Sequence, residues 1–253
     1  MSTTINRSQS YLIKDEGHIF ASTHYPSQQM VSMHALVQLS IGHTPLRVRL
    51  HDRNYETHAY VAGRGVRQLY LQGVPAIGFV IYPQHPIYRA IHAQTKHPVQ
   101  LVSRMLFRRH DPQLLQAFEG KLELEAAANL FRDVTELLEE QLPKPPPLDP
   151  RIASVLQLID ADPTLRIEAL GPAVGLSTNY LSSLFTEMMG IELRLFRLSL
   201  KLSRALRIYK PGMTITEVAQ AAGFTDLQHL SSAFTKLYGA SPTHFIENTD
   251  VHN

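Results

Sequence analysis

An internal repeat near the C-terminal end constrains the fold of this chain more than any other feature. Residues 181–190 read LSSLFTEMMG and residues 230–239 read LSSAFTKLYG, so six of ten positions are identical at an offset of 49. Upstream, Ala173-Val-Gly175-Leu-Ser177 matches Ala221-Ala-Gly223-Phe-Thr225, with one residue fewer between glycine and repeat in the first copy. Each copy predicts a helix, a left-handed glycine, a hydroxyl N-cap (Ser177, or approximately Thr225) and a second helix. This is the pattern of a helix-turn-helix.

The composition is typical of one or two globular domains. The 253 residues are 44% hydrophobic and 18% charged, which excludes a disordered, collagen-like or purely coiled-coil chain. No apolar run reaches the roughly 18 residues of a membrane-spanning helix, and the first residues lack the apolar stretch of a secretory signal, so a cytoplasmic protein is expected. The absence of cysteine excludes disulfides, thiolate zinc sites and a cysteine nucleophile.

A proline-rich segment divides the chain. Residues 142–150 read LPKPPPLDP, and their five prolines favour an extended linker, placed at 143–149. The sequence therefore predicts an N-terminal domain over 1–142 and a helical domain over 150–253. Asp149, Thr214 and Ser241 are predicted N-caps in the helical domain, and Thr214 with Glu217 forms a capping box.

The region from about residue 18 to 92 has the pattern of strands and turns. Stretches rich in β-forming residues at 33–41, 46–50, 66–71 and 76–81 are separated by glycine or proline. Several short strands at this spacing predict a small antiparallel barrel or sandwich of cupin-like type. The fold class expected for the whole chain is α+β, with a β domain followed by an all-α domain.

The helical domain resembles a known family. Residues 215–224, ITEVAQAAGF, and residues 239–242, GASP, together with the two repeats, are similar to the DNA-binding domain of AraC-type transcription regulators over about residues 150–246. The N-terminal half is similar to the effector-binding and dimerisation half of that family in arrangement rather than in motif.

The resemblance implies two recognition helices, at about 178–188 and 226–237, joined by a helix at about 192–209. Their first turns would reach base edges in successive major-groove segments of duplex DNA. The candidates for base contact are Asn179, Ser182, Ser183, Gln228, Ser231 and Ser232. The candidates for phosphate contact are Thr178, Arg194, Arg197, Lys201, Arg204, Thr225 and Lys236. The amides of Asn179 and Gln228 are of most interest because they can bind adenine bidentately.

Charge is distributed unevenly over the helical domain. Residues 193–216 contain no acid, and Arg194, Arg197, Lys201 and Arg204 recur there at helical spacing, which predicts a basic stripe on the joining helix. Two departures from the family pattern matter. Serines occupy positions 183 and 232, where the family usually has arginine, and Pro172, after Gly171, is expected to kink or shorten the first helix of the first copy.

The segment 121–141 is predicted to be an amphipathic helix. Its apolar side chains would be exposed on a lone helix, so they should pack on the β domain or on a second subunit. A homodimer is predicted through this seam, made of Leu130, Phe131, Val134 and Leu138.

The N-terminal domain carries many histidines, but their spacing does not suit a metal. Ten of thirteen precede residue 111, and none shows the tight His-x-His cluster that such a site needs, so neither metal nor cofactor is expected. Arg47, Arg49, Arg64 and Arg67 could hold an acidic effector.

The function predicted is that of a transcription regulator, in particular a ligand-responsive activator that binds double-stranded DNA and contacts RNA polymerase. One alternative is a β-barrel enzyme fused to a DNA-binding module. Another is a DNA-binding factor controlled by a protein partner rather than a small molecule.

Overall fold

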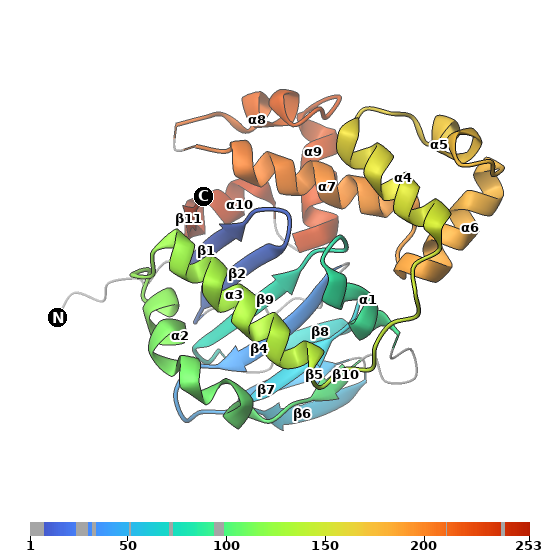
Figure 1. Cartoon of the computed structure of the whole chain (residues 1–253). Coiled ribbons are helices and arrows are strands. Elements are labelled where there is room, and N and C mark those ends of the chain that lie inside the picture. Colours follow the sequence, from blue (N-terminus) through green and yellow to red (C-terminus); the bar gives the residue numbers. More distant parts are fainter. Residues whose placement is uncertain are drawn as a thin grey trace.

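The computed structural model describes residues 8–23, 30–31, 34–50, 52–70, 73–93, 99–210, 212–238 and 241–253. Ten of the eleven strands described lie in the N-terminal half, and the C-terminal half is mainly helical (Figure 1). The strands are β1 (Ser8–Ile13), β2 (Gly17–Ser22), β3 (Met30–Val31), β4 (Ala35–Ser40), β5 (Leu46–Leu50), β6 (Arg53–Thr57), β7 (Ala59–Ala62), β8 (Arg67–Tyr70), β9 (Ala76–Ile81), β10 (Val99–Leu101) and β11 (Thr249–His252). The helices are α1 (Pro86–His92), the 3-10 helix η1 (Arg104–His110), α2 (Asp111–Phe118), α3 (Leu124–Glu139), α4 (Pro150–Ala161), α5 (Ile167–Ala173), α6 (Thr178–Met189), α7 (Leu193–Ile208), α8 (Ile215–Ala221), α9 (Leu227–Tyr238) and α10 (Pro242–Asn248).

The strands form two sheets that face each other. The seven-stranded sheet has the order β10-β7-β4-β9-β2-β1-β11 and the four-stranded sheet the order β3-β8-β5-β6. Strand β5 alternates buried Leu46, Val48 and Leu50 with exposed arginines, as expected when one face of a strand lies in a core. These side chains pack against the larger sheet through Tyr60 and Ala76. The described strands therefore make a cupin-like pair of sheets rather than a closed barrel.

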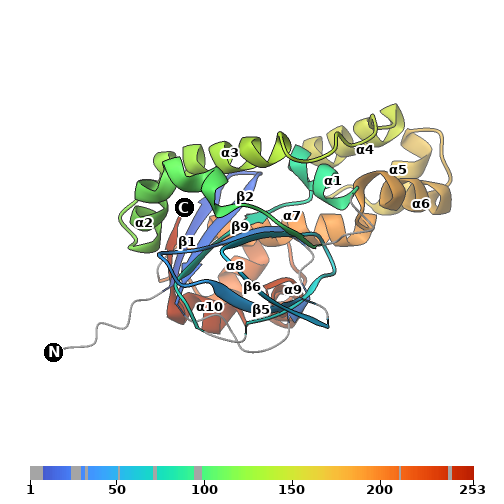
Figure 2. The same ribbon diagram turned by 90° about the horizontal axis from the view of Figure 1, so that it is seen from below.

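Helix α3 covers the outer face of the larger sheet (Figure 2). Its apolar side chains Leu130, Phe131, Val134 and Leu138 are at most 2% exposed within this single chain. The ring of Phe131 lies 6.1 Å from that of Phe79 on β9, and Gly17 on β2 makes room for it, since a Cβ there would lie 2.6 Å from the ring. The prediction that these four side chains pair two subunits is wrong, because the sheet of the same chain already buries them.

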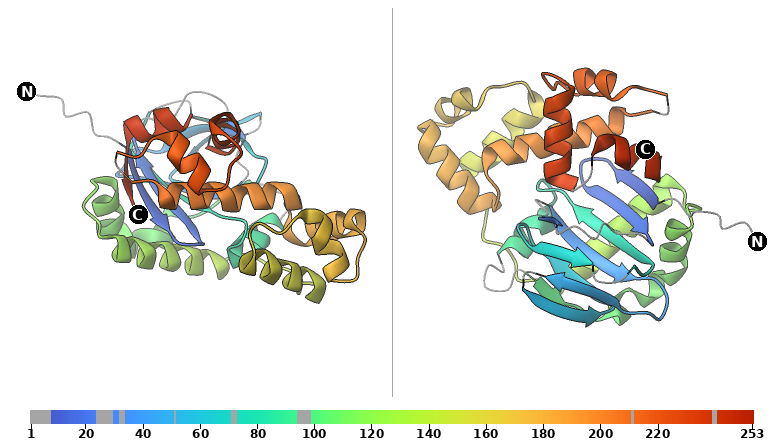
Figure 3. Two further views of the ribbon diagram at one scale, coloured as in Figure 1. Left: turned by 90° about the horizontal axis from the view of Figure 1, so that it is seen from above. Right: turned by 180° about the vertical axis from the view of Figure 1, so that it is seen from behind.

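The chain crosses between its halves twice. Residues 143–149 carry neither helix nor strand between α3 and α4. At the other end, β11 returns to the N-terminal sheet and pairs in parallel with β1, Ser8 opposite Thr249 (Figure 3). The four residues of β11 thus belong structurally to the sheet, although the sequence places them in the helical domain.

Two hydrophobic clusters connect the halves. One runs without interruption from the sheet and α3 to Leu181 and Phe185 of α6. The other joins Leu206, Val218, Leu230 and Phe234 from α7, α8 and α9 with Leu12 of β1. The helical half is therefore packed on the sheets at both of its ends.

Candidate nucleic-acid interface

Two helix-turn-helix units are present, as the repeat predicts. The first unit consists of α5 and α6, the second of α8 and α9, and α7 joins them. The turn glycines Gly175 and Gly223 have φ of +71° and +82°, the left-handed conformation that glycine adopts without a steric penalty. Thr214 and Glu217 form the predicted capping box at the start of α8, and Ser177 Oγ caps α6 by accepting a hydrogen bond from the Tyr180 amide.

The cap of the second recognition helix differs from the predicted one. Asp226, not Thr225, caps α9, since its carboxylate accepts from the His229 amide at 2.7 Å. The Thr225 hydroxyl donates to the Asp226 carboxylate and lies 3.1 Å from His229 Nδ1. The turn between α8 and α9 has one residue more than the turn between α5 and α6, so the N-cap falls one position later. Thr225 stays exposed, and its hydroxyl contacts the first turn of α9.

The recognition helices turn one face to the core and the other outward. Leu181 and Phe185 of α6 are fully buried, and Leu230 and Phe234 of α9 nearly so. The outward face of each helix carries the predicted base-contact residues at equivalent places. Asn179, Ser183, Gln228 and Ser232 are exposed, whereas Ser182 and Ser231 are half-buried. Ser182 Oγ also donates to the Thr178 carbonyl at 2.9 Å, a bond within its own helix.

The basic stripe on α7 divides into two kinds of cation. Arg194 and Arg204 are exposed. Arg197 instead donates to the Pro163 carbonyl at 2.9 Å, and Lys201 donates to the carbonyl of Gly223, the turn residue of the second unit, at 3.0 Å. Among the remaining phosphate candidates, Thr225 and Lys236 are exposed and Thr178 is half-buried.

The first unit has a tighter turn than the second. A Cβ on Gly171 would lie 2.7 Å from the Leu176 carbonyl oxygen, so only glycine fits there. Ala219 is the equivalent residue of α8 and is fully buried. Because the turn between α5 and α6 is one residue shorter, its backbone at Leu176 lies close against Gly171 of α5. Pro172 lies in the last turn of α5, which has seven residues, as α8 does, so α5 is no shorter than its counterpart.

Several exposed side chains in the recognition helices were missed by sequence reasoning. Tyr180 in α6 is 52% exposed, with the Arg151 guanidinium over its ring, and Leu227 at the start of α9 is 42% exposed. His229 and Tyr180 occupy equivalent positions at the offset of 49. The repeat could have indicated the exposure of Tyr180 and His229, because equivalent positions of two repeated helices are expected to face the same way.

The N-terminal domain holds the C-terminal end of each recognition helix. At α6, Arg89 Nε donates to the Met188 carbonyl at 3.0 Å and Arg64 Nη1 donates to the Gly190 carbonyl at 2.7 Å. Cations at a helix C-terminus are electrostatically favourable because the last carbonyls carry partial negative charge. Both contacts are made at the C-terminal end of α6, so they do not cover its first turn.

At α9, a buried cluster replaces the arginines. The Tyr238 ring lies 5.7 Å from that of His18 and 5.5 Å from that of His34. His34 Nε2 lies 3.1 Å from Ser199 Oγ of α7, and His18 Nδ1 lies 3.3 Å from Tyr82 Oη. Burial lowers the pKa of both histidines to about 3 and raises the pKa of Tyr82 to about 12. The cluster is therefore neutral at physiological pH.

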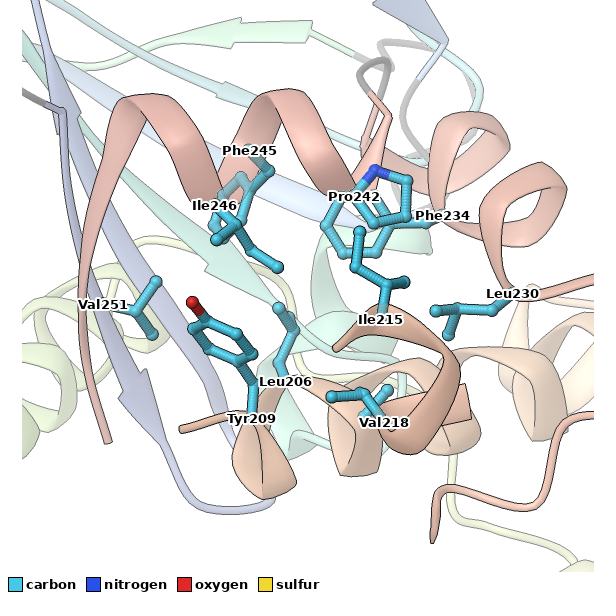
Figure 4. Close-up of a pocket in the computed structure, with 11 residues that line it drawn as sticks. Leu206, Tyr209, Ile215, Val218, Leu230, Phe234, Pro242, Phe245, Ile246 and Val251 are labelled. Atoms are coloured by element: carbon cyan, nitrogen blue, oxygen red, sulfur yellow. The ribbon is translucent and has the colours of Figure 1, made fainter. Parts of the chain in front are cut away.

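Two hollows bear on a small-molecule site. An apolar one lies beside the second unit, among α7, α8, α9, α10 and β11 (Figure 4), and its free volume of about 20 Å³ holds no more than about one water molecule. The other, of about 420 Å³, lies between residues 120–124 and 251–253, and its lining is mainly polar, unlike the mostly apolar lining of typical ligand sites. Neither is lined by residues 18–92.

The arginines predicted to hold an acidic effector do not converge. Arg47 and Arg49 lie exposed on β5, paired with Glu56 and Asn54. Arg64 contacts Gly190, and Arg67 is exposed on β8. Over the described ranges, no three histidine or acidic side chains gather closely enough to hold a metal ion. None of the described helices is both long and apolar enough to cross a membrane.

Comparison with known proteins agrees with this geometry. A family described as helix-turn-helix domain matches residues 170–248. The arabinose operon regulatory protein of Escherichia coli is 33% identical over 135 residues, which cover 50% of this chain and 46% of that protein. The Msm operon regulatory protein of Streptococcus mutans is 26% identical over 83 residues, 32% of this chain and 30% of that protein. The matched segments span less than half of each of these relatives.

Solved structures extend the likeness to the whole chain. ToxT from Vibrio cholerae covers 95% of this chain with 98% of its own length, at a TM-score of 0.55 and 12% identity, which shows a common two-domain fold. The chain combines a β domain with two helix-turn-helix units on one joining helix. The chain thus carries a helix-turn-helix domain over residues 170–248 and is similar over part of its length to operon regulatory proteins of two bacteria.

Proposed function

We propose that this chain regulates transcription by binding duplex DNA through the first turns of α6 and α9. The observation that carries the proposal is the equivalence of Asn179 and Gln228. Each amide is exposed on the outward face of a recognition helix, at the same place in the two copies. Amide side chains at such positions can bond adenine bidentately. The neighbouring serine hydroxyls can donate to or accept from several bases. The exposed cations Arg194, Arg204 and Lys236 supply phosphate contacts.

The test is selection of bound sequences from random duplex DNA by the full chain. We expect a motif of two half-sites separated by about 10 base pairs, since two recognition helices of one chain enter successive turns of the major groove. The double variant Asn179→Ala with Gln228→Ala should fold, because both side chains are exposed, and should lose the motif. Enrichment of no sequence by the wild-type chain would overturn the proposal.

The proposal includes a small-molecule effector in the N-terminal domain. ToxT, whose fold this chain shares, has been solved with an unsaturated fatty acid bound. An effector with a long apolar part would have to enter between the two sheets by displacing apolar side chains that pack there, because neither hollow is lined by residues 18–92. A thermal-shift screen of apolar acids and neutral apolar molecules against the full chain tests this part, and stabilisation by none of them would favour control by a protein partner.

Regulation without catalysis is the third part of the proposal. The relatives named above are operon regulatory proteins, which supports this part of the proposal. Dimerisation remains predicted, but it must use a surface other than the buried side chains of α3, and sedimentation of the full chain measures it. Activation, if that is the outcome, would require contact with RNA polymerase.

A further inference from the structure

Leu227 stands out among the exposed apolar side chains because of its position. It is the first residue of α9 and is 42% exposed, whereas Leu230 of the same helix lies in the core. Exposed leucine at the start of a recognition helix lies where base edges would be met if the helix docks as proposed.

The first turn of α9 is held rigidly around this leucine. The Asp226 carboxylate caps the helix by accepting from the His229 amide at 2.7 Å, and the Thr225 hydroxyl lies 3.2 Å from that carboxylate and 3.1 Å from His229 Nδ1. The His229 ring also meets the Phe224 ring edge-on at 5.2 Å. A fixed first turn places Leu227 and Gln228 at defined positions, and preorganised side chains lose little entropy on binding.

Neighbouring chemistry points to the base pair that Leu227 would meet. The thymine methyl group is the one apolar feature in the major groove, and apolar side chains recognise it. Gln228 follows directly and suits adenine, the partner of thymine. Ser231, four residues on, shares the face of Leu227 and tolerates several bases.

We propose that Leu227 reads a thymine methyl group, so that the second unit selects a step containing an A·T pair through Leu227 and Gln228 together. This inference rests on the proposed function and adds the base chemistry of one half-site. The equivalent residue of the first unit is the half-buried Thr178, so methyl recognition should be confined to the half-site of α9.

The experiment replaces each thymine of the selected site by uracil, which differs only in lacking the methyl group. Binding of the full chain should weaken about fourfold at one thymine of the α9 half-site, the effect of one buried methyl group. Leu227→Ala should bind the thymine duplex equally weakly and should be indifferent to uracil at that position. Leu115→Ala, which truncates an exposed leucine on α2, is the matched control and should behave as the wild type.

The outcomes separate the two proposals. Sequence-specific binding that is indifferent to uracil at every thymine of the α9 half-site overturns the role of Leu227 alone. The same holds if the half-site contains no thymine or if Leu227→Ala retains the sensitivity to uracil. A chain that selects no sequence at all overturns the proposed function and this inference with it.

Discussion

The two helix-turn-helix units share a repeat, yet each is attached to the N-terminal domain by different chemistry. The first unit shares one continuous hydrophobic core with the sheet, and Arg64 and Arg89 bind the last carbonyls of α6. The second unit has a separate core, and the neutral cluster of His18, His34 and Tyr238 holds the end of α9. The repeat thus specifies each unit, while residues outside it decide how strongly and by which forces each unit is fixed.

The largest effects are expected from substitutions in the two cores, because one core is shared with the sheet and the other is separate. Phe185→Ala, at a fully buried site of the first unit, should destabilise the protein by about 3–5 kcal/mol and increase hydrogen exchange in α1 and α3 as well as in α6. Phe234→Ala in the second unit should cost a similar amount but increase exchange mainly in α8, α9 and α10. Urea denaturation and hydrogen exchange by mass spectrometry measure both. Faster exchange confined to α5 and α6 in Phe185→Ala would show that the shared core does not act as one unit.

Acid should loosen the second unit more than the first. Burial lowers the pKa of His18 and of His34 to about 3, so the fold keeps both rings neutral while an unfolded chain would protonate them below about 6.5. Their contribution to stability is therefore complete above pH 6.5 and declines as the pH falls, by about 1.4 kcal/mol per pH unit for each ring until about pH 3. The arginines at α6 stay charged throughout this range.

The measurement for this prediction is urea denaturation from pH 7.5 to 5, with hydrogen exchange localising the change. The double variant His18→Gln with His34→Gln should show a flatter pH dependence than the wild type. His43→Gln, which alters an exposed histidine, should leave it unchanged. A double variant with the wild-type pH dependence would place the acid-sensitive groups elsewhere.

The turn of the first unit offers a smaller effect. Gly171→Ala places a Cβ against the Leu176 carbonyl, so it should destabilise the protein by about 1–3 kcal/mol. The reciprocal change Ala219→Gly in the second unit should cost about 1 kcal/mol through helix propensity and lost packing. Thermal unfolding compares the two. A Gly171→Ala variant more stable than the wild type would mean that the close approach of Leu176 does not require glycine at position 171.

Local features of the fold could be predicted from the sequence. The capping box at Thr214, the left-handed glycines and strands β5 and β9 follow from short-range chemistry, since capping, turn conformation and alternation are set within a few residues. The outward positions of Asn179 and Gln228 follow equally from helical periodicity.

Contacts between residues that are distant in the sequence could not be predicted from it. The pairing of β1 with β11 joins Ser8 to Thr249, and nothing local in either segment specifies that partner. Arg197 and Lys201 have the spacing of a phosphate-binding stripe, but backbone carbonyls of Pro163 and Gly223 lie within their reach once the units fold. The seam on α3 met the sheet of its own chain for the same reason, because amphipathicity predicts burial without naming the surface that provides it.

The first turns of α6 and α9 are proposed to read DNA, and the first turn of α9 is expected to contribute more to specificity because it presents Leu227 beside Gln228. The direct measurement is the base preference of the full chain, compared at every position of its site with those of Gln228→Ala and Asn179→Ala. Gln228→Ala should lose about 1–3 kcal/mol of discrimination at one or two adjacent base pairs, and Asn179→Ala should lose less, in the other half-site. An unchanged preference in Gln228→Ala, with its fold intact, would contradict the account.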